Sequence, residues 1–124
     1  MKKGLLLATL IAFSFQINAQ ISSTYEVSFE NAVHHETEIQ ATFTNLKKKE
    51  VEFRMSRTSP GRYALHEFVK NAYNVKVTDE KGNVLNTTRP DPYSWKVSGH
   101  HGTIKVSYTL FANHGDGTYS QVDE

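Results

Sequence analysis

The sequence predicts a mostly β, antiparallel, sandwich-like single domain with one short helical segment near residues 64–71. Three observations support this prediction. Apolar and polar residues alternate along most of the chain, which is typical of strands with one buried side. Turn signals recur about every 8 to 12 residues, as in β-sandwiches. The 124 residues, with no cysteine and a formal net charge of +1, are enough for one domain and exclude a multi-domain enzyme.

The first 19 residues have the layout of a secretory signal peptide. Two early lysines precede an apolar run over residues 4–15, and Ala19 supplies a small residue before the predicted cleavage site at Gln20. The run is shorter than the roughly 20 apolar residues of a membrane span, so we expect cleavage rather than an anchor. The product, residues 20–124, is then an exported protein of the periplasm or the extracellular space without a transmembrane span. Export without cysteine suits a bacterial envelope protein.

Six segments carry the alternation that predicts strands, because residues two apart share one face of an extended chain. Their apolar residues are Tyr25, Val27 and Phe29; Ile39, Ala41 and Phe43; Val51, Phe53 and Met55; Val75 and Val77; Trp95 and Val97; and Ile104, Val106, Tyr108 and Leu110. From these we predict Phe53, Trp95 and Tyr108 as core residues. We interpret the three lysines at 47–49 as a solvated hairpin loop between the second and third strands.

One segment departs from the alternation. Its apolar residues have the spacing i, i+3, i+4 and i+7, which places them on one face of a helix. They are Leu65, Phe68, Val69 and Ala72. A proline and a glycine at 60–61 precede them, so the sequence predicts a short helix or helical turn over residues 64–71.

The stretch His66-Glu67-Phe68-Val69-Lys70 is close to a zinc-peptidase motif without being one. His-Glu-x-x-His places two histidines on one helix face around the metal, and its glutamate activates a water molecule. Lys70 stands at the second histidine position, and an ammonium group has no lone pair for zinc. We therefore predict no catalytic residue, no metal ligand and no cofactor on this chain.

The other histidines form no chelating set in regular β-structure. The pairs at 34–35 and 100–101 are adjacent residues, which point to opposite faces of a strand, and His114 stands apart. We interpret them as exposed loop histidines, with a metal binder built from the six histidines as an open alternative. The near-neutral charge gives no electrostatic reason to expect nucleic acid as a partner.

The stretch from Ser59 to Asn71, SPGRYALHEFVKN, resembles a motif of the N-terminal domain of the M61 family of metallopeptidases, the glycyl aminopeptidases. The family pattern is threonine or serine, then Pro-Gly-x-Tyr, and then Arg-Glu-Phe. The matching residues are Pro60, Gly61, Tyr63, Glu67 and Phe68. His66 stands where the family commonly has arginine, which puts a charge pair in doubt but not the fold. Similar blocks follow at 77–82, 106–108 and 112–120.

This resemblance implies an accessory domain of a larger enzyme. In the family an all-β domain precedes a thermolysin-like catalytic domain, which holds the zinc ligands and the general base, so zinc is expected only there. Family members run on into further strands, so we expect residues 20–124 to be this β domain truncated at its C-terminal end. Its partner is then the catalytic domain of the same longer chain, whose substrate cleft it helps to shape. The alternative is a free-standing exported β-sandwich that binds a peptide, a glycan or a partner protein.

Overall fold

The structure, a computed structural model, describes residues 20–61, 64–115 and 117–123. The predicted signal peptide and the motif residue Tyr63 lie outside the described residues. In the described part of the chain, no helix is long and apolar enough to cross a membrane.

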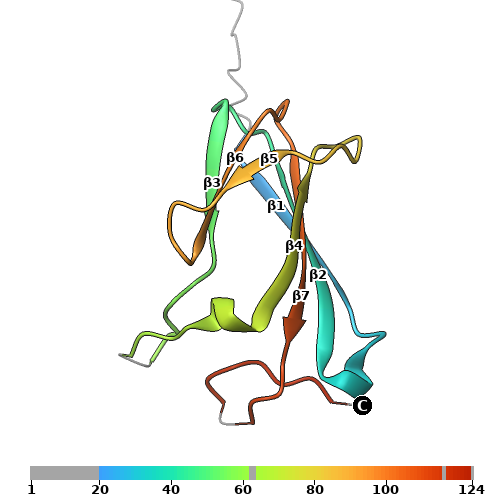
Figure 1. Cartoon of the computed structure of the whole chain (residues 1–124), viewed down its shortest axis with the longest axis vertical. Coiled ribbons are helices and arrows are strands. Elements are labelled where there is room, and N and C mark those ends of the chain that lie inside the picture. The colour runs from blue at the N-terminus through green and yellow to red at the C-terminus, as the bar shows by residue number, and fades with distance from the viewer. Residues whose placement is uncertain (1–19, 62–63, 116, 124) are drawn as a thin grey trace, which may run out of the picture.

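The described chain is mostly β, as the alternation predicts, and its strands form two antiparallel sheets (Figure 1). Two short 3-10 helices, η1 and η2, complete the fold. The elements are β1 (Ser22–Ser28), η1 (Ala32–His34), β2 (Glu36–Thr44), β3 (Glu50–Arg54), η2 (Phe68–Asn71), β4 (Ala72–Thr78), β5 (Asn86–Thr88), β6 (Ser94–Ser98) and β7 (Ile104–Phe111).

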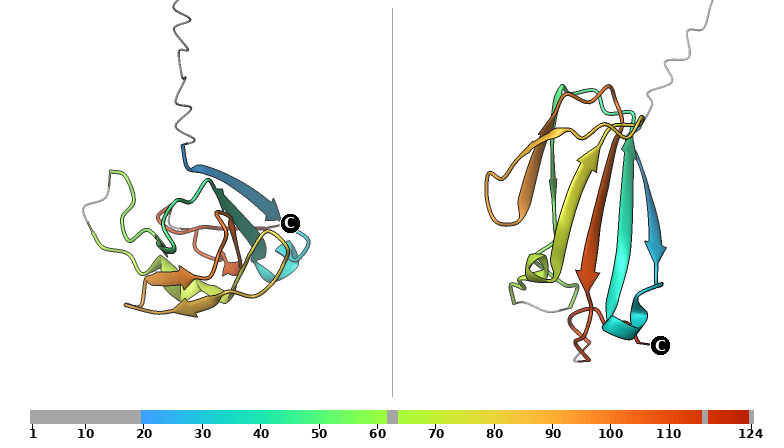
Figure 2. Two further views of the ribbon diagram at one scale, coloured as in Figure 1. Left: turned by 90° about the horizontal axis from the view of Figure 1, so that it is seen from above. Right: turned by 45° about the vertical axis from the view of Figure 1, so that its right-hand side comes forward.

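The larger sheet, sheet A, has the strand order β1-β2-β7-β4, and the smaller, sheet B, has the order β3-β6-β5. Strand β7 lies between β2 and β4, so that Val106 stands opposite Ala41 on one side and Val77 on the other. Figure 2 shows the long strands of sheet A side by side, with the shorter strands of sheet B set against part of that sheet.

The core lies between the two sheets, on the face to which the alternating apolar residues point. Its most buried members are Ala41, Val77, Val97, Ile104 and Val106, each at most 4% exposed. Trp95 is also buried, at 5% exposed. Phe53 and Tyr108, which we predicted in the core, are partly buried and pack against it. They stay partly accessible because both also line open space between the sheets.

The side chains of β1 differ from the prediction that each alternating strand has one buried side. Tyr25 is 61% exposed and Val27 is 48% exposed, while Phe29 lies beyond the end of the strand at 59%. Alternation places Tyr25 and Val27 on one face, but β1 is an edge strand of sheet A and the shorter sheet B leaves that face uncovered.

The lysine run at 47–49 does not form the predicted hairpin loop. Strands β2 and β3, which flank it, belong to different sheets, so this exposed segment crosses from sheet A to sheet B. The predicted helical segment is present but short: one 3-10 turn, η2, covers only its second half. Leu65 is 67% exposed, so the apolar stripe does not form one buried face.

Candidate interaction sites

The described residues of the family-like motif, 59–61 and 64–71, run from the segment after β3 through η2. The backbone N–H of His66 donates to the carbonyl oxygen of Arg57 at 2.8 Å and closes the base of this motif loop. Pro60 and Gly61 are exposed, and Gly61 has a φ of +81°, a conformation that favours glycine. Apart from its chain neighbours, no atom of the described residues comes within 4 Å of the position a Cβ would take there, so the glycine is needed for its backbone angle and not for space.

An aromatic cluster, defined as His66, Phe68, His114 and Tyr119, joins the motif to the C-terminal part of the chain. The Tyr119 ring centroid lies 5.5 Å from that of His66, 5.0 Å from that of Phe68 and 5.0 Å from that of His114. His66 is only 8% exposed, and its Nε2 has no hydrogen-bond partner among the described residues. Ring packing thus holds the residue that replaces the family's arginine. Two of the similar sequence blocks, 59–71 and 112–120, are in contact here.

Glu67 and Lys70 form an ion pair on the exposed side of the motif. The hydrogen bond and charge of Lys70 hold the pKa of Glu67 below its usual range, and Glu67 raises the pKa of Lys70 in return. The glutamate of the zinc-like stretch is therefore engaged by the lysine that stands at the second histidine position. This arrangement is an exposed ion pair on the surface of the domain.

The histidines outside the aromatic cluster are dispersed, and two of them, His35 and His100, correct our interpretation that they are exposed. His34, His101 and His114 are exposed, but His100 is only 9% exposed, because the turn after β6 folds its ring inward. Its Nδ1 accepts a hydrogen bond from the backbone N–H of Gly102 at 3.1 Å. His35 is half-buried, with its Nδ1 2.9 Å from the carbonyl oxygen of Val122. Across residues 20–61, 64–115 and 117–123, no three His, Asp or Glu residues are grouped so that they could hold a metal ion.

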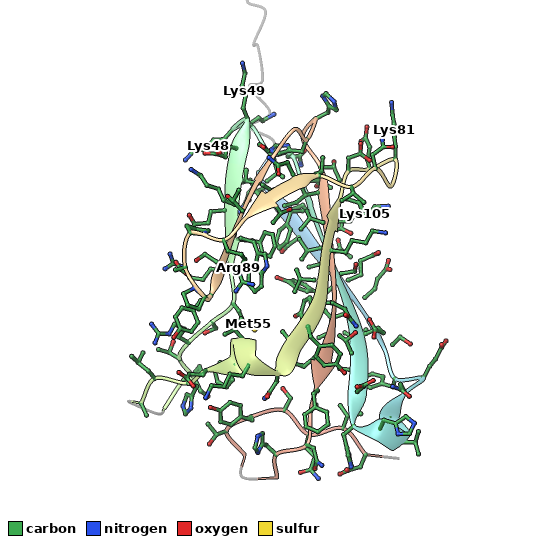
Figure 3. The ribbon with its side chains drawn as sticks, in the orientation of Figure 1. Lys48, Lys49, Met55, Lys81, Arg89 and Lys105 are labelled. Carbon is green, nitrogen blue, oxygen red and sulfur yellow. The ribbon has the colours of Figure 1, made fainter. Side chains whose placement is uncertain are left out.

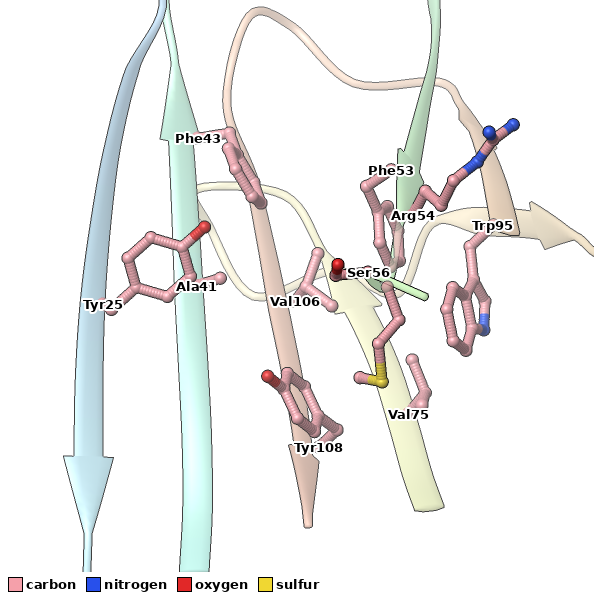
Figure 4. Close-up of a pocket in the computed structure, with 11 residues that line it drawn as sticks. Tyr25, Ala41, Phe43, Phe53, Arg54, Ser56, Val75, Trp95, Val106 and Tyr108 are labelled. Carbon is pink, nitrogen blue, oxygen red and sulfur yellow. The ribbon is translucent and has the colours of Figure 1, made fainter. Parts of the chain in front are cut away.

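The second candidate site is the inter-sheet groove, which opens between β1 and β2 on one side and β3 on the other (Figure 4). It consists of two adjoining hollows of about 320 and about 740 Å³. Both hollows are lined by Tyr25, Phe43, Phe53 and Arg54. Our sequence reasoning missed this groove, because alternation shows which side chains share a face but not whether another sheet covers them.

The sheet B wall of the inter-sheet groove is fixed by ring stacking and charge pairs. The rings of Phe53 and Trp95 are stacked, with centroids 5.2 Å apart and planes 4° from parallel. The Arg89 guanidinium lies 4.2 Å from the Trp95 ring centroid. Arg54 donates from Nε to the Ser94 hydroxyl at 3.1 Å and pairs with Glu52.

The opposite wall, from sheet A, is mostly apolar. The rings of Tyr25 and Phe43 meet edge to face, with centroids 6.3 Å apart. Burial raises the pKa of the Tyr108 hydroxyl, which lies deeper on the same sheet. The groove therefore presents apolar rings inside and charged side chains at its sheet B rim.

These features define the class of the protein: a domain of two antiparallel β-sheets. The model of the family described as the Peptidase M61 N-terminal domain matches residues 24–124, and the chain belongs to this family. The family that the motif residues resemble is thereby confirmed.

A solved structure supports the fold. The crystal structure of a protein described as belonging to the aminopeptidase N family, from Idiomarina loihiensis, superposes with a TM-score of 0.74 at 16% sequence identity. The match covers 82% of this chain and 17% of the other. At this identity the likeness concerns the fold alone. We find no match to a curated protein sequence.

Proposed function

We propose that this chain is the non-catalytic N-terminal accessory domain of an exported M61-like zinc metallo-aminopeptidase. In this role it packs against the catalytic domain of the same longer polypeptide and shapes one wall of the substrate cleft. The observation that carries the proposal is the family match over residues 24–124, which spans every strand except the first two residues of β1. The zinc ion and its ligands belong, in this proposal, to the catalytic domain.

The motif loop supplies the docking face of this proposal. Leu65 extends from it with 67% of its surface exposed, next to the Glu67–Lys70 ion pair. In this proposal, Leu65 is the apolar contact of the interface and the ion pair belongs to its polar rim. The aromatic cluster anchors the loop from beneath, so the loop can present Leu65 without unfolding.

The first test is enzymatic. The purified chain should not cleave glycyl or other aminopeptidase substrates, with or without added zinc. Zinc-dependent cleavage that disappears in His66→Ala would show a catalytic site on this chain and overturn the proposal.

The second test concerns docking. The DNA downstream of codon 124 should encode His-Glu-x-x-His, in frame or after one frameshift. In the longer polypeptide, Leu65→Asp should lower kcat/KM at least about tenfold, because a charge placed in an apolar contact is costly. Val84→Asp is the matched control, since Val84 is 69% exposed and lies away from the motif. Equal kcat/KM values for the two variants would show that the motif loop is not part of the interface.

The third test concerns export. Expression of the full reading frame with periplasmic fractionation should yield a chain that begins at Gln20 by N-terminal sequencing. An intact Met1 in the cytoplasmic fraction would contradict export.

A further inference from the structure

The free edge of β3 is the strongest unassigned feature of the molecule. Strand β3 pairs with β6 on one side, from Glu50 opposite Ser98 to Arg54 opposite Ser94. Within the described ranges no strand pairs with its other edge. An edge strand presents unpaired backbone N–H and C=O groups, which can pair with an added strand.

The inter-sheet groove runs along this edge and fits the side chains that an added strand would bring. Val51 and Phe53 alternate toward the groove, where they are partly buried. Tyr25, 61% exposed, faces them from β1 across the open space (Figure 4). A strand beside β3 would place every second side chain into this space and cover the exposed rings.

The outward side chains of β3 set the charge order of such a strand. Glu50, Glu52 and Arg54 are exposed and read negative, negative, positive along the chain. They already form surface ion pairs on sheet B, Glu50 with Lys96 at 2.7 Å and Glu52 with Arg54 at 3.2 Å, so an added strand would share these charges. Opposite charges directly across a strand pair stabilise it, and like charges destabilise it. The complementary strand therefore carries a negative residue opposite Arg54 and positive residues opposite the two glutamates.

The lysines before β3 favour the antiparallel direction. Lys47 and Lys48 line the groove at the end where β3 begins, and Figure 3 shows Lys48 and Lys49 at that end of the strand. An antiparallel segment brings its C-terminal end, with the carboxylate, to these ammonium groups.

We propose that the free edge of β3 binds an extended C-terminal segment of a partner polypeptide. The segment lies antiparallel to β3 as a fourth strand of sheet B. Its apolar side chains fill the inter-sheet groove, and its charged side chains complement Glu50, Glu52 and Arg54. This function does not depend on peptidase activity or on the motif loop.

Two hexapeptides of identical composition test the charge order. In the matched peptide, Val-Glu-Val-Lys-Val-Lys, glutamate falls opposite Arg54 and lysines fall opposite Glu52 and Glu50. The swapped peptide, Val-Lys-Val-Glu-Val-Lys, exchanges the first two charges. The chain contains one tryptophan, Trp95, whose stacking on Phe53 makes its fluorescence a reporter of the groove wall, with calorimetry as a second readout. We expect a Kd about tenfold lower for the matched peptide, because two cross-strand pairs change sign between the peptides.

The double variant Glu52→Lys with Arg54→Glu should reverse the preference, so that the swapped peptide binds about tenfold more tightly. Both positions are exposed, and circular dichroism checks the fold. If the double variant fails to fold, Glu52→Gln alone should still reduce the preference several-fold. Lys76→Glu is the control: Lys76 is exposed on β4 of sheet A, away from β3, and its replacement should leave the preference unchanged.

Main-chain pairing is tested by N-methylation of the matched peptide. A strand pairs through alternate residues, so one of two peptides methylated at alternate positions should lose binding and the other should keep it. Four results would overturn the proposal. The matched and swapped peptides bind equally, or neither peptide binds. The double variant keeps the wild-type preference, or both methylated peptides bind. Concentration-dependent dimerisation blocked by Glu52→Lys would assign the edge to a second copy instead.

Discussion

Replacing Phe53 by alanine measures how open the inter-sheet groove is. One face of the Phe53 ring stacks on Trp95, at 5.2 Å between centroids, and the ring also lines both hollows of the groove. The residue is therefore packed on one face and accessible on the other. The loss of stability on truncation should reflect this one-sided packing.

Truncating a fully buried phenylalanine costs about 3–5 kcal/mol. Because only one face of the Phe53 ring is packed, we expect Phe53→Ala to cost about half as much, near 2 kcal/mol. This figure includes about 0.5–1.5 kcal/mol from the ring stack. Ile104→Ala is the buried reference, since Ile104 is 2% exposed. It removes three buried carbons, worth about 2.4 kcal/mol before any cavity is counted, so its cost should be larger. Lys96→Ala, on the outer face of β6, should leave the unfolding midpoint nearly unchanged.

Urea unfolding followed by far-UV circular dichroism gives these free energies, because Trp95 emission itself changes when Phe53 is removed. A cost above about 4 kcal/mol for Phe53→Ala would mean that both ring faces are packed. The groove would then be closed and the proposed strand binding excluded. A cost below about 0.5 kcal/mol would mean that the stack on Trp95 does not form in solution.

Three further outcomes follow from the hydrogen bonds. Asp79 accepts hydrogen bonds from the Asn83 side chain and from the turn backbone, which lower the pKa of its carboxyl group. Asp79→Asn should therefore reduce the free energy of unfolding at pH 7. The difference in stability between wild type and variant should vanish as the pH falls through the lowered pKa of folded Asp79, because the wild-type carboxyl group is then protonated too. The hydrogen bond to Glu36 raises the pKa of Tyr73 to about 12, and ultraviolet titration of Glu36→Gln should show it falling toward its usual range. His66→Phe should keep or raise the melting temperature, because the buried Nε2 has no partner to lose among the described residues; a clear drop would reveal a hydrogen bond from elsewhere in the chain.

The strands could be predicted from the sequence, but their partners could not. Alternation at Ile104, Val106 and Tyr108 identifies β7, since period two follows from the geometry of an extended chain. Nothing in that pattern indicates that β7 pairs with β2 and β4, because pairing depends on segments far apart in the chain. The same limit explains the lysine run at 47–49, which joins two sheets where a short polar segment suggests a hairpin.

Burial was predictable only where both sheets are present. Val97 and Tyr25 belong to similar alternating patterns, yet Val97 is 0% exposed and Tyr25 is 61% exposed. The difference lies in how far sheet B extends over sheet A, which local sequence does not encode. The aromatic cluster was missed for a related reason: the ring of Tyr119 packs on His66 through tertiary structure alone, although both lie in blocks that resemble the family.

The central place of β7 also fixes the order in which the molecule can assemble. Sheet A consists of the β1–β2 pair and of β4, and these are joined only through β7. During synthesis, β1, β2 and β4 are made before β7, so until then β1 and β2 can form at most a marginal two-stranded hairpin. Closure of sheet A must wait for β7 and requires contacts between distant segments, which slows folding. A nascent chain halted before Ile104 would expose two unsatisfied strand edges, which makes chaperone binding or proteolysis at that stage a natural checkpoint on its production.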